Sequence, residues 1–217
     1  MGSHGVHEML PSAISITQTS ELGTVYQLEH IRNISKIAKK NKLKLHMDGA
    51  RFANACAFLK CTPSEMTWKS GIDILSLGAT KNGALSCELV VVFNKSLYAN
   101  VDRRQKRAGH LLSKQKFIAA QIIKWIENDK WIKAASKANN FAKKIENILK
   151  NNNKINVIYP IESNMIFLEL SLESELNLKK NNVEFYNWPS NNNTLRFVTS
   201  WNFKNQEINI LKNIFNN

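Results

Sequence analysis

Apolar and polar positions in the first half of the chain follow two alternating spacings. Residues 26–42 and 50–60 carry apolar side chains three and four positions apart, which is the period of an α-helix. Nearly continuous apolar runs of strand length lie around these helical stretches, at residues 12–17, 43–48, 72–78 and 87–94. Buried strands joined by helical crossovers are typical of a mainly parallel sheet covered by helices on both faces. We therefore predict an α/β fold for this half.

The second half has a different order of elements. Residues 114–128 and 131–150 have the apolar spacing of two long helices. Four short strand-like runs and one final helical pattern follow them, at residues 155–160, 165–170, 183–188, 195–201 and 205–215. Such an order is typical of an α+β unit. We predict two domains, an α/β domain at residues 1–128 and a small α+β domain at residues 129–217.

The net charge of +13 on 217 residues raises the question of a nucleic-acid partner. The lysines are spread along the whole chain, however, and no aromatic RNA-binding signature accompanies them. A solvated basic surface is therefore the expected interpretation, with no nucleic-acid partner. One dense basic cluster, at residues 102–110, leaves nucleic-acid or anion binding open as an alternative function.

The sequence also indicates where the protein is located and whether it crosses a membrane. No apolar run approaches the roughly 20 residues that span a bilayer. The first ten residues lack the basic and then apolar order of a secretory signal. The three cysteines are few and odd in number, which argues against a disulfide framework or a zinc site. We expect a cytoplasmic protein with no membrane partner and no metal.

Ionisable residues flanked by small ones follow two of the predicted strands. Asp48 and Arg51 come after the first of these strands, and Lys81 comes after the second. Ligands of parallel α/β sheets bind beyond the carboxyl ends of the strands. Pyridoxal phosphate fits such a set, because its aldehyde forms a Schiff base with a lysine and its ring nitrogen keeps a proton beside a carboxylate. The arginine would then make a bidentate contact with the carboxylate of an amino-acid substrate.

Each of these residues also has an ordinary structural explanation. Lys81 would be a solvent-facing lysine in a turn, and Asp48 would be the N-cap of the helix that follows it. Arg51 would pair with Asp48 three residues earlier. His46 shares a strand face with Asp48, so that it either supports Asp48 by a hydrogen bond or packs in the core.

The segment "HMDGARFANA" followed by "DILSLGATKNGAL" resembles the threonine aldolase and β-eliminating lyase family of pyridoxal-phosphate enzymes, which have the aspartate-aminotransferase type of fold. The segments "PSAISITQTSELGTVY", "RRQKRAGHLLSKQKFIAAQ" and "LRFVTSW" support the resemblance. Together they cover nearly the whole chain in the order of the family. The resemblance implies that residues 1–128 form part of the large cofactor-binding domain.

The resemblance also implies a role for each matching residue. Lys81 would be the Schiff-base lysine, and Asp48 would be the acid paired with the pyridine nitrogen. Arg51 would help to hold the substrate carboxylate or nearby cofactor atoms. Arg196 would bind the substrate carboxylate, its structural alternative being a simple ion pair. Basic residues would reach the cofactor phosphate of a neighbouring subunit, namely Arg103, Arg104, Lys106 and Arg107.

The resemblance implies cleavage of a β-hydroxy amino acid, for example of L-threonine to glycine and acetaldehyde. It also implies a homo-oligomer, a dimer or a tetramer, with active sites at the subunit interfaces. Family members are longer at the amino end, where they carry the cup for the cofactor phosphate and a histidine that stacks on its ring. Nothing before residue 12 resembles that region. The resemblance therefore implies a truncated form, with a non-catalytic fragment or pseudo-enzyme of the same fold as the alternative. The catalytic base, the preferred amino acid and its stereochemistry are not identified by these motifs.

Overall fold

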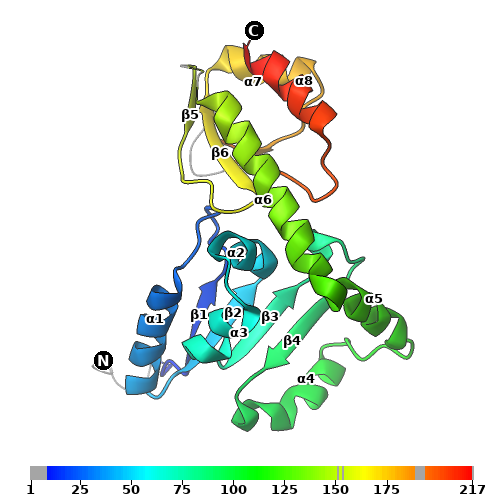
Figure 1. The fold of residues 1–217 in the computed structure, drawn as a ribbon. Coiled ribbons are helices and arrows are strands. Elements are labelled where there is room, and N and C mark those ends of the chain that lie inside the picture. Colours follow the sequence, from blue (N-terminus) through cyan, green and yellow to red (C-terminus); the bar gives the residue numbers. More distant parts are fainter. Residues whose placement is uncertain (1–8, 151, 153, 189–193, 217) are drawn as a thin grey trace.

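The structure is a computed structural model that describes residues 9–150, 152, 154–188 and 194–216. It contains two four-stranded sheets, one in each half of the chain (Figure 1). The first sheet has the order β1-β2-β3-β4, with bounds Ala13–Thr17, Lys44–Gly49, Ile74–Gly78 and Glu88–Val92. The pairs β1–β2 and β2–β3 are parallel, and β4 runs antiparallel to β3. The predicted α/β fold with a mainly parallel sheet is confirmed.

Three helices cover one face of this sheet: α1 (Leu28–Lys40), α2 (Phe52–Leu59) and α3 (Pro63–Met66). Side chains of these helices pack against alternate residues of the central strands, among them Leu45, Met47, Leu75 and Leu77. The opposite face carries polar and exposed residues, and Val90 on it is 59% exposed. The expectation of helices on both faces is therefore wrong for the described part of the chain. Continuous apolar runs overstated the burial of β4, whose residues are exposed or half-buried.

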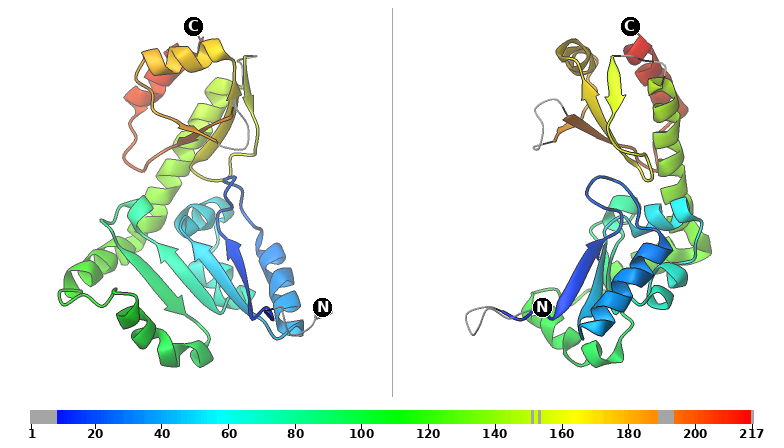
Figure 2. Two further views of the ribbon diagram at one scale, coloured as in Figure 1. Left: turned by 180° about the vertical axis from the view of Figure 1, so that it is seen from behind. Right: turned by 90° about the vertical axis from the view of Figure 1, so that its left-hand side faces the viewer.

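After β4 the chain forms α4 (Val101–Arg107), α5 (Lys116–Ile126) and the long helix α6 (Lys130–Leu149). Helix α6 extends from the first sheet to the second (Figures 1 and 2). Its first turns, with Trp131 and Ala135, belong to the core of the first half. Its later turns, with Ala142 and Ile145, belong to the core of the second. The division into domains at residues 1–128 and 129–217 stays a prediction, since α6 packs into both cores.

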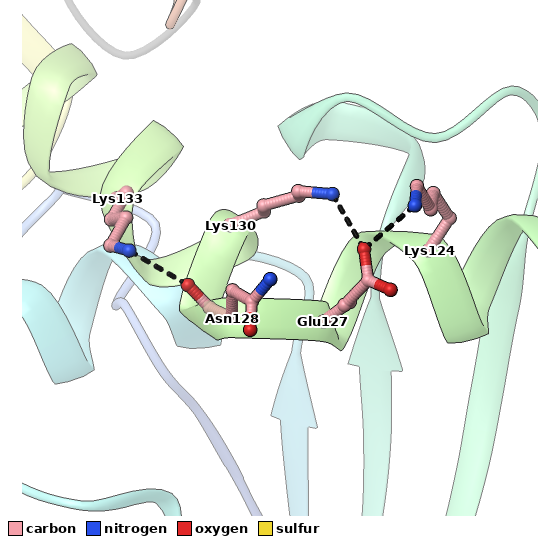
Figure 3. Close-up of polar contacts among 5 residues, drawn as sticks. All are labelled: Lys124, Glu127, Asn128, Lys130 and Lys133. Atoms are coloured by element: carbon pink, nitrogen blue, oxygen red, sulfur yellow. Dashed lines mark hydrogen bonds and ion pairs between the residues drawn. The ribbon is translucent and has the colours of Figure 1, made fainter.

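The junction between α5 and α6 is a sharp break in the helix. Asn128 and Asp129 both have left-handed backbone angles, with φ of 54° and 57°. Glu127 braces the break, because its Oε2 lies 2.8 Å from the Lys124 Nζ and 2.7 Å from the Lys130 Nζ (Figure 3). These two lysines lower the pKa of Glu127 to about 2.

The second sheet is entirely antiparallel and has the order β5-β6-β8-β7. Its strands span Ile155–Val157, Met165–Leu170, Thr194–Val198 and Tyr186–Asn187. Helices α6, α7 (Leu172–Lys180) and α8 (Asn205–Asn216) pack against one face through residues such as Ile166, Leu168 and Leu195. The four predicted strands and the last helix are present, whereas α4 and α7 were not predicted.

The halves are in contact near the strand ends. The backbone N–H of Val25, in the loop after β1, donates to the Glu162 Oε2 at 2.6 Å. Trp201, just after β8, lies against Gly83, where an added Cβ would be 3.6 Å from the indole ring. The loop after β8 therefore reaches the turn that follows β3.

Candidate active site

The carboxyl ends of β2 and β3 lie directly side by side. Asp48 pairs with Ser76 in the parallel register of the two strands. Beyond them, a Cβ placed on Gly78 would lie 2.8 Å from the Cα and the carbonyl oxygen of Ala50. Only glycine permits so close a backbone approach. The segment that carries Asp48 and Arg51 therefore touches the segment that leads to Lys81.

Asp48 lies within β2 and is half-buried. Its Oδ1 accepts a hydrogen bond of 3.0 Å from the Ala50 N–H, and its carbonyl oxygen accepts one of 2.7 Å from the Gln18 N–H. Its Oδ2 accepts no hydrogen bond from any residue that the structure describes. Helix α2 begins at Phe52 and has Arg51 as its N-cap, so the interpretation of Asp48 as that cap is wrong.

His46 shares the face of β2 with Asp48, but its ring is engaged elsewhere. The Nδ1 lies 2.8 Å from the Ser15 Oγ and the Nε2 lies 3.0 Å from the Ser76 Oγ. The imidazole thus bridges the two neighbouring strands. Among the described residues it makes no hydrogen bond to Asp48, so the predicted supporting bond is absent there.

Lys81 lies in a short 3-10 helix, η2 (Thr80–Asn82), and its side chain is exposed. The turn itself is held firmly by its buried neighbour Asn82. The Asn82 side-chain amide donates to the Trp131 carbonyl oxygen at 2.8 Å, and the Trp125 indole N–H donates to the Asn82 carbonyl oxygen at 2.9 Å. Lys81 therefore projects from a rigid support, with no hydrogen bond or ion pair to the described residues.

Glu88 also supports this turn. Its carboxylate accepts hydrogen bonds from the backbone N–H groups of Ala79 and Thr80, at 3.1 Å and 3.4 Å. Neither Glu88 nor Asn82 was predicted as a site residue. The asparagine directly after the lysine, in a turn between two apolar runs, was the available signal, because an amide that becomes buried there requires hydrogen-bond partners.

Arg51 and Arg196 come from different halves of the chain, and the positive charge of Arg196 acts on Arg51. Burial lowers the pKa of Arg51 to about 10, the nearby charge of Arg196 lowers it as well, and Glu21 offsets part of this effect. Neither arginine takes part in the ion pairs found among the described residues, so pairing with Asp48 and a simple structural ion pair of Arg196 both lack support there. The Nε of Arg196 is buried without a hydrogen-bond partner in the same set of residues. Guanidinium groups that repel one another and have no carboxylate partner among the described residues favour an anionic ligand.

The basic cluster forms part of α4, and its position separates it from these residues. Helix α4 lies beyond the far end of β4, whereas β1, β2 and β3 point toward the second sheet (Figure 1). Within one chain, helix α4, which carries the basic residues Arg103, Arg104, Lys106 and Arg107, lies away from the carboxyl end of β3 (Figure 1). Their contact with a neighbouring subunit's cofactor phosphate, and the nucleic-acid alternative, stay predictions.

Solved structures share this fold. A threonine aldolase from Leishmania major matches 98% of the chain with a TM-score of 0.90 and 24% identity, and the match covers 63% of that protein. A putative L-allo-threonine aldolase from Listeria monocytogenes matches 94% of the chain, and 60% of its own length, with a TM-score of 0.74 and 14% identity. A PLP-bound putative aminotransferase from Clostridium difficile matches with a TM-score of 0.64 and 14% identity, over 94% of this chain and 58% of that one. At such identities the likeness concerns the fold, which is that of pyridoxal-phosphate transferases.

Sequence relatives are closer. The chain is 39% identical over 196 residues to a low-specificity L-threonine aldolase from Pseudomonas sp. and 38% identical to one from Pseudomonas aeruginosa. Each match covers 90% of this chain and 56% of the relative, so the chain spans about half the length of the curated relatives it matches. The sequence model of the beta-eliminating lyases matches residues 2–171. The chain belongs to the beta-eliminating lyase family.

Proposed function

We propose that the chain carries cofactor- and substrate-binding residues of a pyridoxal-phosphate-dependent lyase. Its substrate would be a β-hydroxy amino acid, with cleavage of L-threonine to glycine and acetaldehyde as the type reaction. The observation that carries the proposal is the contact between two strand ends, one bearing Asp48 and Arg51 and the other leading to Lys81. The names of the Pseudomonas relatives, low-specificity L-threonine aldolases, support the substrate class.

The residues at these strand ends fit the cofactor. Lys81 has an exposed amine on a rigid turn, and it is the residue that would hold the aldehyde. Asp48 keeps one oxygen without a hydrogen bond to the described residues, and its carboxylate would hold a proton on the ring nitrogen. The bound cofactor supplies an electron-withdrawing ring that accepts electrons from a breaking bond at the substrate Cα.

The two arginines would bind and orient the substrate. A carboxylate placed between Arg51 and Arg196 relieves their mutual repulsion and satisfies the Arg196 Nε. Fixing the carboxylate also fixes the direction of the Cα–Cβ bond relative to Lys81. His46 already has both ring nitrogens engaged with serines, so we assign it no proton transfer.

We further propose that the protein acts as a homo-oligomer, a dimer or a tetramer. Helix α5 exposes large apolar side chains, with Phe117 at 64% and Ile123 at 66% exposed, and exposed apolar side chains of this size favour an interface. Light scattering coupled to size-exclusion chromatography tests this, and a monomer at micromolar concentration would contradict it.

The compartment that we propose is the cytoplasm. All three cysteines are free, which suits a reducing environment. None of the helices in the described ranges has the length and apolar character needed to cross a membrane.

Spectroscopic titration of the purified chain with pyridoxal phosphate tests the proposed function. We expect a saturable absorbance change that Lys81→Ala abolishes and that Lys95→Ala, a change at another exposed lysine, preserves. Glycine and acetaldehyde should then form from L-threonine, and Lys81→Ala should lower the rate at least about 1,000-fold, as for other covalent catalytic groups. If millimolar cofactor gives no saturable change, the alternative of a non-catalytic family member holds instead.

A further inference from the structure

Arg196 lies against two aromatic rings of the second sheet. Its Cζ is 4.9 Å from the centroid of the Tyr186 ring and 5.3 Å from that of the Trp188 ring. The register of the sheet brings these groups together, because Tyr186 on β7 pairs directly with Arg196 on β8. A guanidinium ion is attracted to the face of an aromatic ring at such distances.

The Trp188 ring is fixed by the buried part of the sheet. Trp188 packs edge-on against Phe167 of β6, with centroids 5.1 Å apart and planes at 88°. Phe167 is only 1% exposed, so it is a firm support for the indole. The backbone of Trp188 is anchored as well, since its N–H donates to the Thr194 carbonyl oxygen at 2.8 Å.

This arrangement holds the arginine without using its hydrogen-bond donors. Contact with a ring face involves the flat side of the guanidinium group, whereas its N–H groups point outward in its plane. A carboxylate partner would hold the group equally well but would neutralise it and occupy those donors. The buried Nε of Arg196 without a partner among the described residues agrees with the first arrangement.

We propose that Tyr186 and Trp188 are positioning residues, which hold the Arg196 guanidinium with its N–H donors available to the carboxylate of the substrate. The inference rests on the proposed function for the identity of the carboxylate. The rings also oppose the repulsion between the two arginines, because they attract the Arg196 cation while Arg51 repels it.

Nuclear magnetic resonance of the ¹⁵N-labelled full chain tests the contact directly, through the Nε–H signal of Arg196, which is assigned by its loss in Arg196→Lys. Aromatic ring currents should displace this signal from those of exposed arginines. Tyr186→Leu and Trp188→Leu should each move it toward them. The matched control is Tyr98→Leu, at a tyrosine of the first half that is 62% exposed, and it should leave the signal unchanged. Tyr186 is 51% exposed, so its variant should fold even if the tryptophan variant does not.

Titration of the same samples with acetate, as a simple carboxylate, tests whether the contact between Arg196 and the two rings supports carboxylate binding. Acetate should shift the Arg196 Nε–H signal, and either leucine variant should weaken acetate binding by about 10-fold, within the range measured for cation–π contacts. Tyr186→Phe, which keeps a ring, should bind acetate nearly as the native chain does.

An unmoved signal in Tyr186→Leu, or unchanged acetate affinity in that variant, overturns the inference. Absence of any acetate response at Arg196 in the native chain overturns it too, because the arginine then offers no carboxylate site. Failure of the cofactor titration described above contradicts the proposed function alone. In that case displaced and acetate-sensitive Arg196 signals still support the positioning role.

Discussion

Arg51 occupies a position that is unfavourable for its charge in three respects. It is largely buried, it is repelled by the charge of Arg196, and it is the N-cap of α2, where the helix dipole presents its positive end. Glu21 partly offsets these effects. A residue that works against the stability of the fold in this way is typical of a binding site.

Replacing Arg51 should therefore stabilise the chain in the absence of ligand. The pKa of Arg51 falls from 12.5 to about 10, so its protonated form costs free energy in the folded state at neutral pH. We expect Arg51→Gln to raise the free energy of unfolding by about 1–3 kcal/mol at pH 7 while it weakens carboxylate binding. Urea unfolding measures this, with Arg32→Gln on the exposed side of α1 as the control. A less stable Arg51→Gln chain would show that the guanidinium has a structural partner.

The cysteines at the end of α2 differ in their reactivity. The neighbouring Cys56 thiol lowers the pKa of Cys61, which is half-buried, whereas the pKa of Cys56 is raised and its side chain is 1% exposed. Burial also raises the pKa of Cys87. A disulfide reagent at pH 7.5 should therefore label Cys61 first. Cys61→Ser should remove the fast phase and Cys87→Ser should keep it; fast labelling that survives Cys61→Ser would refute the assignment.

At the scale of elements, the break between α5 and α6 directs the long helix toward the second sheet. Glu127 supports this break through Lys124 and Lys130. The pKa of Glu127 is lowered in the folded chain, so its contribution to stability is complete above its ordinary value of 4.5 and is lost as the pH falls through about 2. The two ion pairs are exposed, which keeps this contribution small.

A thermal melt at two pH values checks the contribution of Glu127. At pH 7, Glu127→Gln should lower the melting temperature by about 1–3 °C. Near pH 2 the difference from the native chain should shrink, because the native carboxyl is then becoming protonated as well. Glu184→Gln, at an exposed glutamate in the loop before β7, should have no effect at either pH. A difference that persists unchanged at low pH would mean that the glutamine acts through packing.

Helices and strands with a clear pattern of apolar and polar residues were predicted, and those with a weak pattern were not. Strands β1, β2 and β3 were predicted because their apolar runs are bounded by polar turns. Helix α7 was not predicted, because its leucines do not mark one buried face of a helix. Leu178 is buried, whereas Leu172 and Leu176 are exposed. The exposure of one face of the first sheet could not be predicted from the sequence either, because an apolar run does not show which elements cover the strand.

At the scale of the whole molecule, the candidate site depends on both halves of the chain. Arg196 comes from the second sheet, whereas Asp48, Arg51 and Lys81 come from the first, and α6 packs into both cores. Motif resemblance indicated these four residues from the sequence. That Asp48, Arg51 and Lys81 converge on one edge of the sheet was expected from the sequence. The close backbone contact at Gly78 and the pairing of Tyr186 with Arg196 depend on three-dimensional packing and were not predicted.

Lys81 is the residue that we propose to hold the cofactor. Incubation of the chain with pyridoxal phosphate, reduction with borohydride and mass mapping of the peptides test this role. We predict that the peptide containing Lys81 carries the cofactor mass at near one per chain, and that Lys81→Ala carries none at the same cofactor concentration. Preferential labelling of another lysine, or equal labelling across the many exposed lysines, would contradict the account.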